Sequence, residues 1–536
     1  MDGVHLDLVS TRWSHAASGD AWLWRPLRNW YADVTSVDAL VTAAPADRRG
    51  QWTVVSRQGD DLRIDTDHTR SHHLLFARAG DTWIVSDDPE RLRRHLASWR
   101  RDDEAADVFL HTGFVVGNRT LVRGVHATPA ASTVHLHPDG TWESTLWDSY
   151  RYSNDPITSE ADYAAAYDEA MDRTVGRLLE YAGDRQLVIP LSGGLDSRLL
   201  AIWLKRLKAP RVVAFTYGKP GARETGISRN VADALGIDWF SIDLDPGEVA
   251  RRWATTQAAV FQAATWGMTS LPHVQDWYAL TSIRERSLIA DDAVLLPGFA
   301  AVLRPGYALP RRFGGARDLL TSTPSRSEVL TAIARNHAAV QGSSTAWRHL
   351  PLLREEILRC EKETPLTGER GVQGLMSWFN ARERQAKYIN NSTKSYEFFG
   401  YDWALPMLDS EVWDCWLRGS EELTATRDWY ARYIAQHYAT MTGQDQELYL
   451  AASISLPATP KRVLQSAMRA TGGDRLLSRS RSVRTMLDHP MAFEAFSASI
   501  PRIEQARRFA AGNTTLGIWT RLFLDNQWGA DLVPAP

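Results

Sequence analysis

Short runs of alternating apolar and polar residues dominate the first 150 positions of the chain. Five of these runs are rich in β-branched and aromatic residues, and turns such as Gly-Asp and Pro-Asp-Gly separate them. This spacing is typical of strands in a β-rich unit. The strands are predicted over Gln51–Val55, Leu62–Asp65, His73–Ala77, Thr82–Ser86 and Ser132–Leu136.

The pattern changes after a polar, turn-like stretch at 150–156, which we interpret as a linker. Ser159–Ala182 has the period of an amphipathic helix and begins with a capping serine. Strands and helices then alternate, which predicts a parallel, doubly wound sheet that binds ligands at the carboxyl ends of its strands. From about Ser325 onward the chain is mainly helical. The predicted strands are Gln186–Leu191, Arg211–Tyr217, Trp239–Leu244 and Ala293–Leu296, and the helices between them are Arg198–Lys208, Glu224–Leu235 and Asp276–Arg286.

One loop of this region, Ser-Gly-Gly-Leu-Asp-Ser at 192–197, carries the most specific chemistry. A strand, a glycine-rich turn and a helix N-terminus together bind anions, because backbone N–H groups and the helix dipole face the ligand. Gly193 and Gly194 let a phosphate approach, and the hydroxyls of Ser192 and Ser197 can donate to it. Asp196 would repel bare phosphate, so we expect it to hold Mg²⁺ that carries the phosphates. The order matches neither a Walker A loop nor a dinucleotide fingerprint.

Composition narrows the classes of function. The formal net charge of −3 over 536 residues gives no electrostatic footprint for a long nucleic acid or an acidic membrane. Two cysteines exclude a disulfide scaffold and suit a reducing, cytoplasmic location. No apolar stretch approaches the roughly 18 residues of a membrane span, and the acidic start differs from a signal peptide.

Histidines and a basic run are weaker signals. His135 and His137 share one face of a predicted strand, but two histidines without a third ligand carry little weight as a metal site. His72 and His73 are expected on a strand surface. The basic run at 478–484 is expected to be a solvated loop, with docking of an acidic carrier protein or peptide as the alternative.

The loop resembles the pyrophosphate loop of ATP pyrophosphatases, and nearly the whole chain resembles the asparagine synthetase superfamily, including β-lactam synthetases and lasso-peptide cyclases. The resemblance implies an α/β protein with two parts. Residues 1–150 would form a β-rich, glutaminase-like αββα domain of the N-terminal-nucleophile (Ntn) type, and 157–536 an ATP pyrophosphatase (synthetase) domain with a helical C-terminal region. The further segments that carry the resemblance are Val213–Gly218, Ala222–Glu224, Ala232–Gly236, Ser86–Glu90, Phe109–Gly113 and Thr120–Val125.

The resemblance also implies site residues. The expected ATP contacts, with Asp196 also on Mg²⁺, are Leu191, Ser192, Gly193, Gly194, Asp196, Ser197, Thr216, Tyr217, Gly218 and Gly298. Glu397, in an aromatic segment, is expected to have a raised pKa that suits a base for an amine, with a helix-surface role as the alternative. Lys461, on a proline-stiffened loop, is expected to stabilise charge at the α-phosphate, with Lys387 and Lys394 as alternatives. Asp409 is expected to cap a helix.

Two departures from the family pattern bear on function. Glutamine-using members expose an N-terminal cysteine as nucleophile, whereas Met1 is followed here by Asp2 and neither cysteine lies in the first 150 residues. We therefore expect no glutaminase activity. The second departure is the segment 295–303, where apolar residues replace an acidic turn that supplies a second Mg²⁺ ligand. Either Asp196, water and ATP hold the metal, or adenylation is weak or lost.

The sequence thus predicts an ATP-dependent amide-forming ligase that adenylates a carboxylate, releases pyrophosphate and then AMP, and uses no glutamine. Its expected partners are a small-molecule or peptide carboxylate and an amine, with a carrier protein, a precursor peptide or a second copy of the chain left open. No long nucleic acid and no membrane are expected. The alternative is a catalytically degraded relative that binds nucleotide or a partner without turnover. Sulfur transfer to tRNA is disfavoured, because such enzymes need cysteines near the site and a basic surface.

Overall fold

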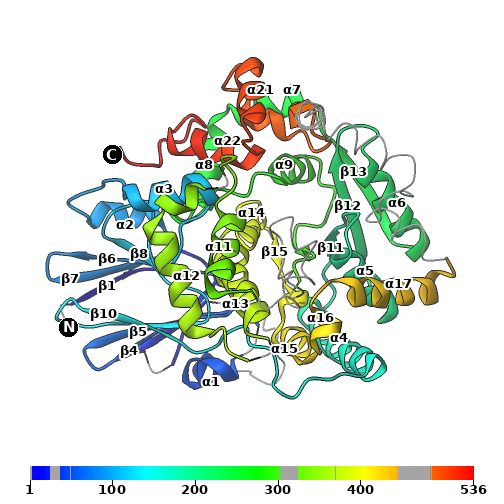
Figure 1. Ribbon diagram of the computed structural model, residues 1–536, viewed down its shortest axis with the longest axis horizontal. Helices are drawn as coiled ribbons and strands as arrows, with labels where there is room; N and C mark the ends of the chain where they lie inside the picture. The colour runs from blue at the N-terminus through cyan, green and yellow to red at the C-terminus, as the bar shows by residue number, and fades with distance from the viewer. Residues whose placement is uncertain are drawn as a thin grey trace.

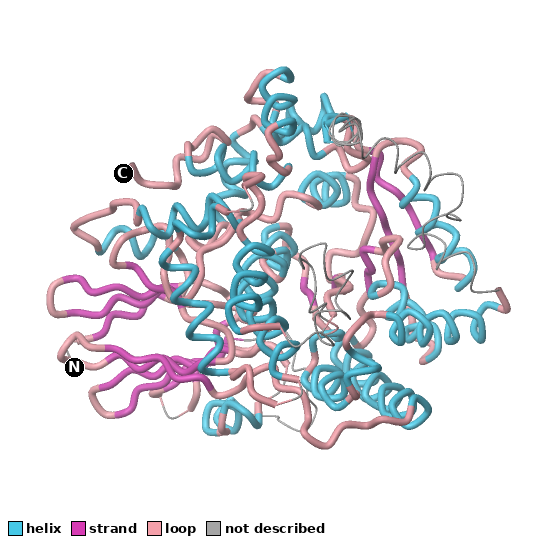
Figure 2. Tube along the Cα trace, viewed as in Figure 1, coloured by secondary structure: helices cyan, strands magenta, loops and turns pink. Residues whose placement is uncertain are grey.

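The computed structural model arranges the chain as two β regions with helices between and around them (Figure 1). It describes residues 3–17, 19–24, 37–48, 50–300, 302, 324–343, 345–368, 370–444, 483–484 and 486–535. Figure 2 shows the strands of the N-terminal part on one side and those of the later sheet on the other.

The N-terminal part contains two sheets. The first has the order β1-β7-β6-β8 and the second the order β10-β9-β5-β4-β3-β2. Apolar side chains of both sheets, such as Val55 and Ile64 of one and Phe76 and Val85 of the other, form one buried cluster. The strands are β1 (Val4–Asp7), β2 (Trp13–His15), β3 (Ala21–Trp24), β4 (Thr53–Gln58), β5 (Asp61–Thr66), β6 (Leu75–Ala79), β7 (Thr82–Ser86), β8 (Val125–Ala127), β9 (Ser132–Leu136) and β10 (Trp142–Leu146).

All five strands expected here are present, within a few residues of their predicted ends. Five more were missed, and their physical reasons differ. β1, β2, β8 and β10 lie at sheet edges and hold three to five residues, so their pairing depends on the neighbouring strand rather than on their own pattern. β3 has no alternation because most of its side chains are buried. The helices of this part are α1 (Val37–Thr42), α2 (Pro89–His95) and α3 (Asp103–Thr112).

The later sheet is parallel, as predicted, with the order β13-β12-β11-β14-β15. The chain adds strands on one side of β11 and then on the other, which makes β11 and β14 the pair at which the strand order reverses. The elements are α4 (Glu160–Ala182), β11 (Leu187–Pro190), α5 (Asp196–Arg206), β12 (Val212–Gly218), α6 (Arg223–Leu235), β13 (Asp238–Asp243), α9 (Trp277–Glu285), β14 (Val294–Leu295) and β15 (Asp402–Trp403).

Local sequence explains these elements. Ser159 caps α4 by accepting a hydrogen bond from the backbone N–H of Asp162, as expected. The strand β11 is apolar throughout because other strands flank it on both edges and helices cover it. The remaining helices are α7 (Pro246–Trp253), α8 (Thr256–Thr265), α11 (Arg326–His337), α12 (Pro351–Glu363), α13 (Gly371–Phe379), α14 (Ser392–Phe398), α15 (Ser410–Arg418), α16 (Glu421–Thr424), α17 (Asp428–Thr442), α21 (Arg502–Ala510) and α22 (Thr515–Leu524).

Buried charges join the two β regions. Within the π-helix Asn380–Ile389, the Lys387 ammonium donates to Glu383 at 2.6 Å and to the carbonyls of Val115 and Gly117 at 2.9 and 2.7 Å. Burial lowers the pKa of Lys387 to about 8. Because both charged side chains are buried, removing either partner would leave the other uncompensated.

No helix in the described part of the chain is long and apolar enough to cross a membrane. The domain limits 1–150 and 157–536, and the glutaminase-like class of the first part, stay predictions.

Burial of His337, the last residue of α11, makes stability dependent on pH. Its ring lies 4.8 Å from that of Phe379, and burial, with repulsion from Arg384, lowers its pKa from 6.5 to about 3. Between these values the unfolded chain binds a proton that the folded chain does not, so stability falls as the pH falls through this window. Within this window, each such histidine should lower the free energy of unfolding by about 1.4 kcal/mol for each pH unit that the pH falls.

The substitution His337→Phe should flatten this dependence, measured as urea-unfolding midpoints between pH 7 and pH 4.5. His349→Phe is the control, because His349 is exposed. An equal slope in the wild type and in His337→Phe would contradict the assignment.

Candidate nucleotide site

The predicted anion-binding loop follows β11 directly, at the pair of strands where the order reverses. Crevices at such positions bind ligands in open α/β sheets. Gly298 follows the neighbouring strand β14 and lies directly against the loop. A Cβ atom on Gly298 would lie 2.5 Å from the backbone N of Ser197 and 2.8 Å from its Cα. Only glycine allows the two strand ends to approach this far. The structure therefore brings Gly298 and the loop together, as expected.

Hydrogen bonds within the loop fix its shape. Ser197 Oγ accepts from the backbone N of Ser192 at 3.2 Å, and the Oγ atoms of these two serines lie 3.2 Å apart. The backbone N of Gly194 donates to Ser192 Oγ at 3.1 Å. Asp196 opens α5, so the loop lies at the positive end of that helix. Leu191 is buried beneath it.

Two side chains from elsewhere in the chain already contact the loop. The backbone N of Gly193 donates to the Glu224 carboxylate at 3.2 Å, and Glu224 lies in the first turn of α6. On the other side, the Arg427 guanidinium donates to the Asp196 carboxylate. An anion thus contacts a loop N–H and a cation contacts the carboxylate expected to bind metal.

Arg427 is the site residue that the sequence reasoning missed. It lies 231 residues after Asp196, immediately before α17, and its guanidinium also lies 5.1 Å from the Tyr430 ring. No local motif marks it, because α17 is brought to the loop by its packing on α5 and α6. The one available signal was an arginine just before a long helix that follows the predicted sheet.

Three of the residues predicted to contact ATP, Thr216, Tyr217 and Gly218, lie at the end of β12. Thr216 is buried, Tyr217 is half-buried, and a Cβ atom on Gly218 would lie 3.3 Å from Thr225 Oγ1 and 3.5 Å from the carbonyl oxygen of Pro490. The backbone N of Lys219 donates to that same carbonyl at 2.7 Å. The chain around Pro490 therefore packs against this strand end and borders the expected nucleotide position.

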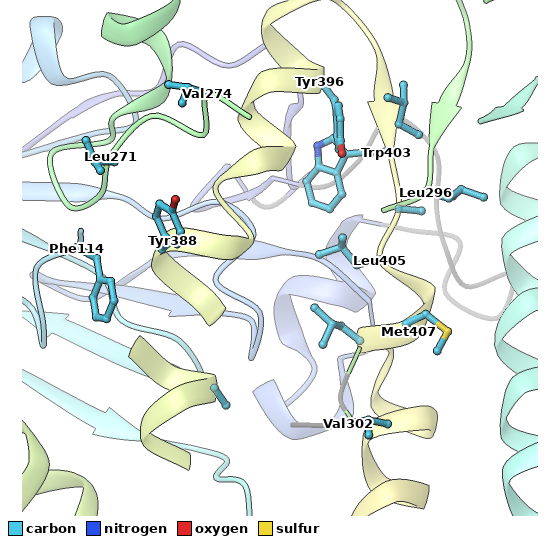
Figure 3. Packing of buried hydrophobic residues seen from close by; sticks show 14 of the residues in the cluster. Phe114, Leu271, Val274, Leu296, Val302, Tyr388, Tyr396, Trp403, Leu405 and Met407 are labelled. Carbon is cyan, nitrogen blue, oxygen red and sulfur yellow. The ribbon is translucent and has the colours of Figure 1, made fainter. Parts of the chain in front are cut away.

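The segment after β14 presents no carboxylate to the loop among its described residues. Val302 is 4% exposed, and Figure 3 shows it in the region of Met407 and Leu405, below the end of β14. Asp291 lies at the opposite end of that strand, where it pairs with Arg284 at 2.5 Å. Asp196 is therefore the carboxylate of the loop itself, and Mg²⁺ fits there only with phosphates and water as its other ligands.

Glu397 does not have the raised pKa that was expected. Burial would raise it, but Arg12, Lys394 and His72 stabilise the charged form, and the pKa of Glu397 is lowered overall. Arg12 lies 3.5 Å away and the Trp403 indole donates to Glu397 at 2.9 Å. A carboxylate held in its charged form by cations is a weak base for an amine.

This part of the structure also corrects the expectation for His72 and His73, which are both buried rather than on a strand surface. His72 Nε2 lies 3.3 Å from the Asp87 carboxylate, and the His72 ring stacks on Trp24. Asp87 also accepts from the Trp13 indole at 2.8 Å. Glu397 and His72 thus belong to the junction between the two β regions.

The predicted lysines and Asp409 lie in different parts of the structure or outside its described residues. Lys461 lies outside the described residues, as does most of the basic run at 478–484. Lys387 is buried against carbonyls of the N-terminal part, and Lys394 contributes to the field around Glu397. Asp409 caps α15, as predicted, by accepting from the backbone N of Glu411 at 3.0 Å.

Comparison with known proteins places this site in a family-matched segment. Residues 166–280 match the model of the asparagine synthase family, a segment that includes the loop, Glu224 and the end of β12. No curated protein sequence matches the chain.

Among solved structures, the NMN synthetase of Francisella tularensis is 15% identical with a TM-score of 0.18, covering 27% of this chain and 57% of its own length. The U34-tRNA thiolase NcsA of Methanococcus maripaludis is 11% identical with a TM-score of 0.20, covering 42% and 87%. The ammonia-dependent NAD synthetase of Campylobacter jejuni is 13% identical with a TM-score of 0.20, covering 42% and 94%. At these TM-scores the likeness supports no conclusion about this chain.

The close approach at Gly298 gives a direct test of the site. Gly298→Ala should abolish or strongly weaken binding of ATP, because the added Cβ would meet the Ser197 backbone and force the loop away. Overpacking of this kind costs about 1–3 kcal/mol of stability. Binding would be measured by calorimetry and folding by the thermal midpoint.

Gly226→Ala is the matched control, since Gly226 lies inside α6 with nothing within 4 Å of the added atom. Unchanged ATP binding in a folded Gly298→Ala protein would show that the crevice between β11 and β14 is not the nucleotide site.

Proposed function

We propose that this chain is an ATP-dependent ligase that forms an amide bond through an acyl-adenylate. The observation that carries the proposal is the loop at 192–197, where a backbone N–H faces a carboxylate and a carboxylate faces a guanidinium. ATP requires both kinds of contact, because its phosphates bind to N–H donors and to cations. The family match of the segment that contains the loop supports the same class of activity.

The loop would bind the pyrophosphate part of ATP. The Glu224 carboxylate accepts from the N–H of Gly193, which indicates that this N–H can donate to an anionic oxygen. The phosphate chain of ATP carries several negative charges, whereas a carboxylate carries one, and the N-terminus of α5 favours anions. Ser192 and Ser197 would contribute their hydroxyls once the phosphates replace the contacts between them.

Arg427 would neutralise charge on the departing pyrophosphate. A guanidinium beside the loop can exchange Asp196 for a phosphate and bind two of its oxygens at once. Asp196 would then hold Mg²⁺ together with phosphates and water, and the ion supplies further neutralisation of phosphate charge. A local cation of this kind accords with a loop that has Asp196 as its one acidic residue.

The reaction we propose has two steps, adenylation of a carboxylate and transfer of the acyl group to an amine. A substrate carboxylate oxygen attacks the α-phosphorus of ATP, the bond to the β-phosphate oxygen breaks, and pyrophosphate leaves. An amine then attacks the acyl carbon, AMP leaves with the bonding electron pair, and the amine proton passes to water or a nearby base. The products are an amide, AMP and pyrophosphate. We expect the pathway to be one of specialised biosynthesis, such as peptide or lactam cyclisation.

We further propose that the amine does not come from glutamine. Hydrolysis of glutamine by a thiol requires an accessible thiolate. Cys360 is fully buried and Cys415 nearly so, and burial raises the pKa of both thiols, that of Cys415 to about 12. The amine would then be part of the substrate or a separate small molecule, presented with or without a carrier or precursor peptide.

The first test is release of pyrophosphate and AMP by the purified protein with ATP, Mg²⁺ and a panel of carboxylates and amines. Turnover that requires one class of carboxylate and that Asp196→Ala abolishes is the expected result. ATP binding with no turnover across a broad panel would favour a protein that binds nucleotide without catalysis. No ATP binding at all would overturn the assignment of the loop.

The role of Arg427 is tested by Arg427→Met, which removes the charge and keeps much of the side-chain volume. The rate of pyrophosphate release should fall roughly 10²–10³-fold, the usual effect of losing one charge-stabilising group. Arg427→Lys should restore part of the rate, because the charge returns without the planar pair of donors.

Arg432→Met is the matched control on the same helix. Arg432 is exposed and pairs with Glu160 at 3.1 Å, an ion pair that contributes little. Equal rates in Arg427→Met and Arg432→Met would exclude Arg427 from the reaction.

A further inference from the structure

Three side chains of the metal-binding types meet on the N-terminal part, on elements other than those of the nucleotide site. They are His5 and Asp7 of β1 and His95, the last residue of α2. One ligand atom of each lies within 4.8 Å of the others. In the described part of the chain, no other group of three His, Cys, Asp or Glu side chains meets this condition.

The local fold explains why the three side chains converge. Alternate residues of a strand point to the same face, so His5 and Asp7 share one face of β1. β1 pairs with β7, with Asp7 opposite Ser86, and α2 begins three residues after that strand. Asp88 caps α2 by accepting from the backbone N of Arg91 at 2.8 Å, which fixes the start of the helix. Its seven residues then bring His95 to the face of β1.

The distances within the group suit an ion rather than direct hydrogen bonds. His95 Nε2 lies 3.8 Å from Asp7 Oδ2, and the rings of His5 and His95 lie 4.6 Å apart. Two ligands of one tetrahedral Zn²⁺, each about 2.1 Å from it, lie about 3.4 Å apart. A shift of a few tenths of an ångström would bring the ligand atoms of His95 and Asp7 to that separation, and a ligand atom of His5 lies within 4.8 Å of both. Arg91 approaches the other oxygen of the carboxylate, Oδ1, at 4.0 Å, so the oxygen near His95 is the one that faces the site.

We propose that His5, Asp7 and His95 bind one divalent transition metal ion, with Zn²⁺ as the representative. Two imidazoles and one carboxylate select ions of this class over Mg²⁺ and Ca²⁺, which prefer oxygen ligands. Because the histidines are exposed, water would complete the coordination sphere.

The ion would hold the edge strand β1 in place. β1 has β7 as its one neighbour in the sheet, and the metal would join β1 to α2 as well. The chain that leaves β1 gives the backbone N–H groups of Val9 and Ser10 to Asp87, at 2.7 and 3.0 Å. Two residues further, Arg12 lies 3.3 Å from Asp402 of β15. Fixing β1 would therefore fix the start of the segment that contacts the parallel sheet.

The test uses the full-length protein without an affinity tag, stripped of metal with EDTA. Titration with Zn²⁺ should show one equivalent bound and a rise in the thermal midpoint, because a ligand that binds only the folded state stabilises it. His95→Ala and His5→Ala should each weaken Zn²⁺ binding roughly tenfold or more. Even residues that only hydrogen-bond to a metal ligand contribute that much to affinity. Co²⁺ should give the visible absorption of a nitrogen- and oxygen-ligated ion, and His95→Ala should lose it.

His135→Ala is the matched control. His135 and His137 form another histidine pair on a strand, with rings 6.5 Å apart, but they do not belong to a group of three. Zn²⁺ binding should persist in His135→Ala and in Asp196→Ala, the latter because the site is independent of ATP. Equal Zn²⁺ affinity in the wild type and in folded His95→Ala and His5→Ala, or no bound equivalent in the wild type, would overturn the proposal.

Discussion

The reversal of strand order between β11 and β14 is the constraint on which the candidate site depends. Each strand end delivers one half of the site: the loop at 192–197 follows β11, and Gly298 follows β14. The two halves approach so closely that a single methyl group would separate them. Helix α5 begins inside this crevice, so its N–H groups and its dipole are aimed at whatever lies between the strands.

Charge in the crevice is balanced by residues from distant parts of the chain. Glu224 from α6 and Arg427 from the start of α17 contact the loop on two sides. These contacts satisfy the half-buried N–H of Gly193 and the half-buried carboxylate of Asp196. The site is therefore polar. The segment after β14 nevertheless carries apolar residues at the place where the family pattern has a second acidic residue for Mg²⁺.

A second polar network holds the two β regions together. Lys387 donates to carbonyls of the N-terminal part and Glu383 accepts from the backbone N of Gly117, while Arg12 contacts both Glu397 and Asp402. Glu397, expected as a base, is in this network, and its neighbours keep it charged. Buried ion pairs of this kind contribute little net stability, but removing one partner leaves the other charge buried and unpaired.

Local sequence patterns predicted many of the helices and strands and the loop, because residues close together in the chain form each of them. Alternation identified five strands, the 3.6-residue period identified α4, α5, α6 and α9, and the order Ser-Gly-Gly-Leu-Asp-Ser identified the anion-binding turn. The sequence also placed Asp409 as a helix cap. What only the tertiary structure decided involves pairs far apart in the chain: Arg427 with Asp196, Glu397 with Arg12, and the edge strands of three to five residues. Their positions depend on packing between whole elements, and the pKa of Glu397 depends on charges that no local pattern contains.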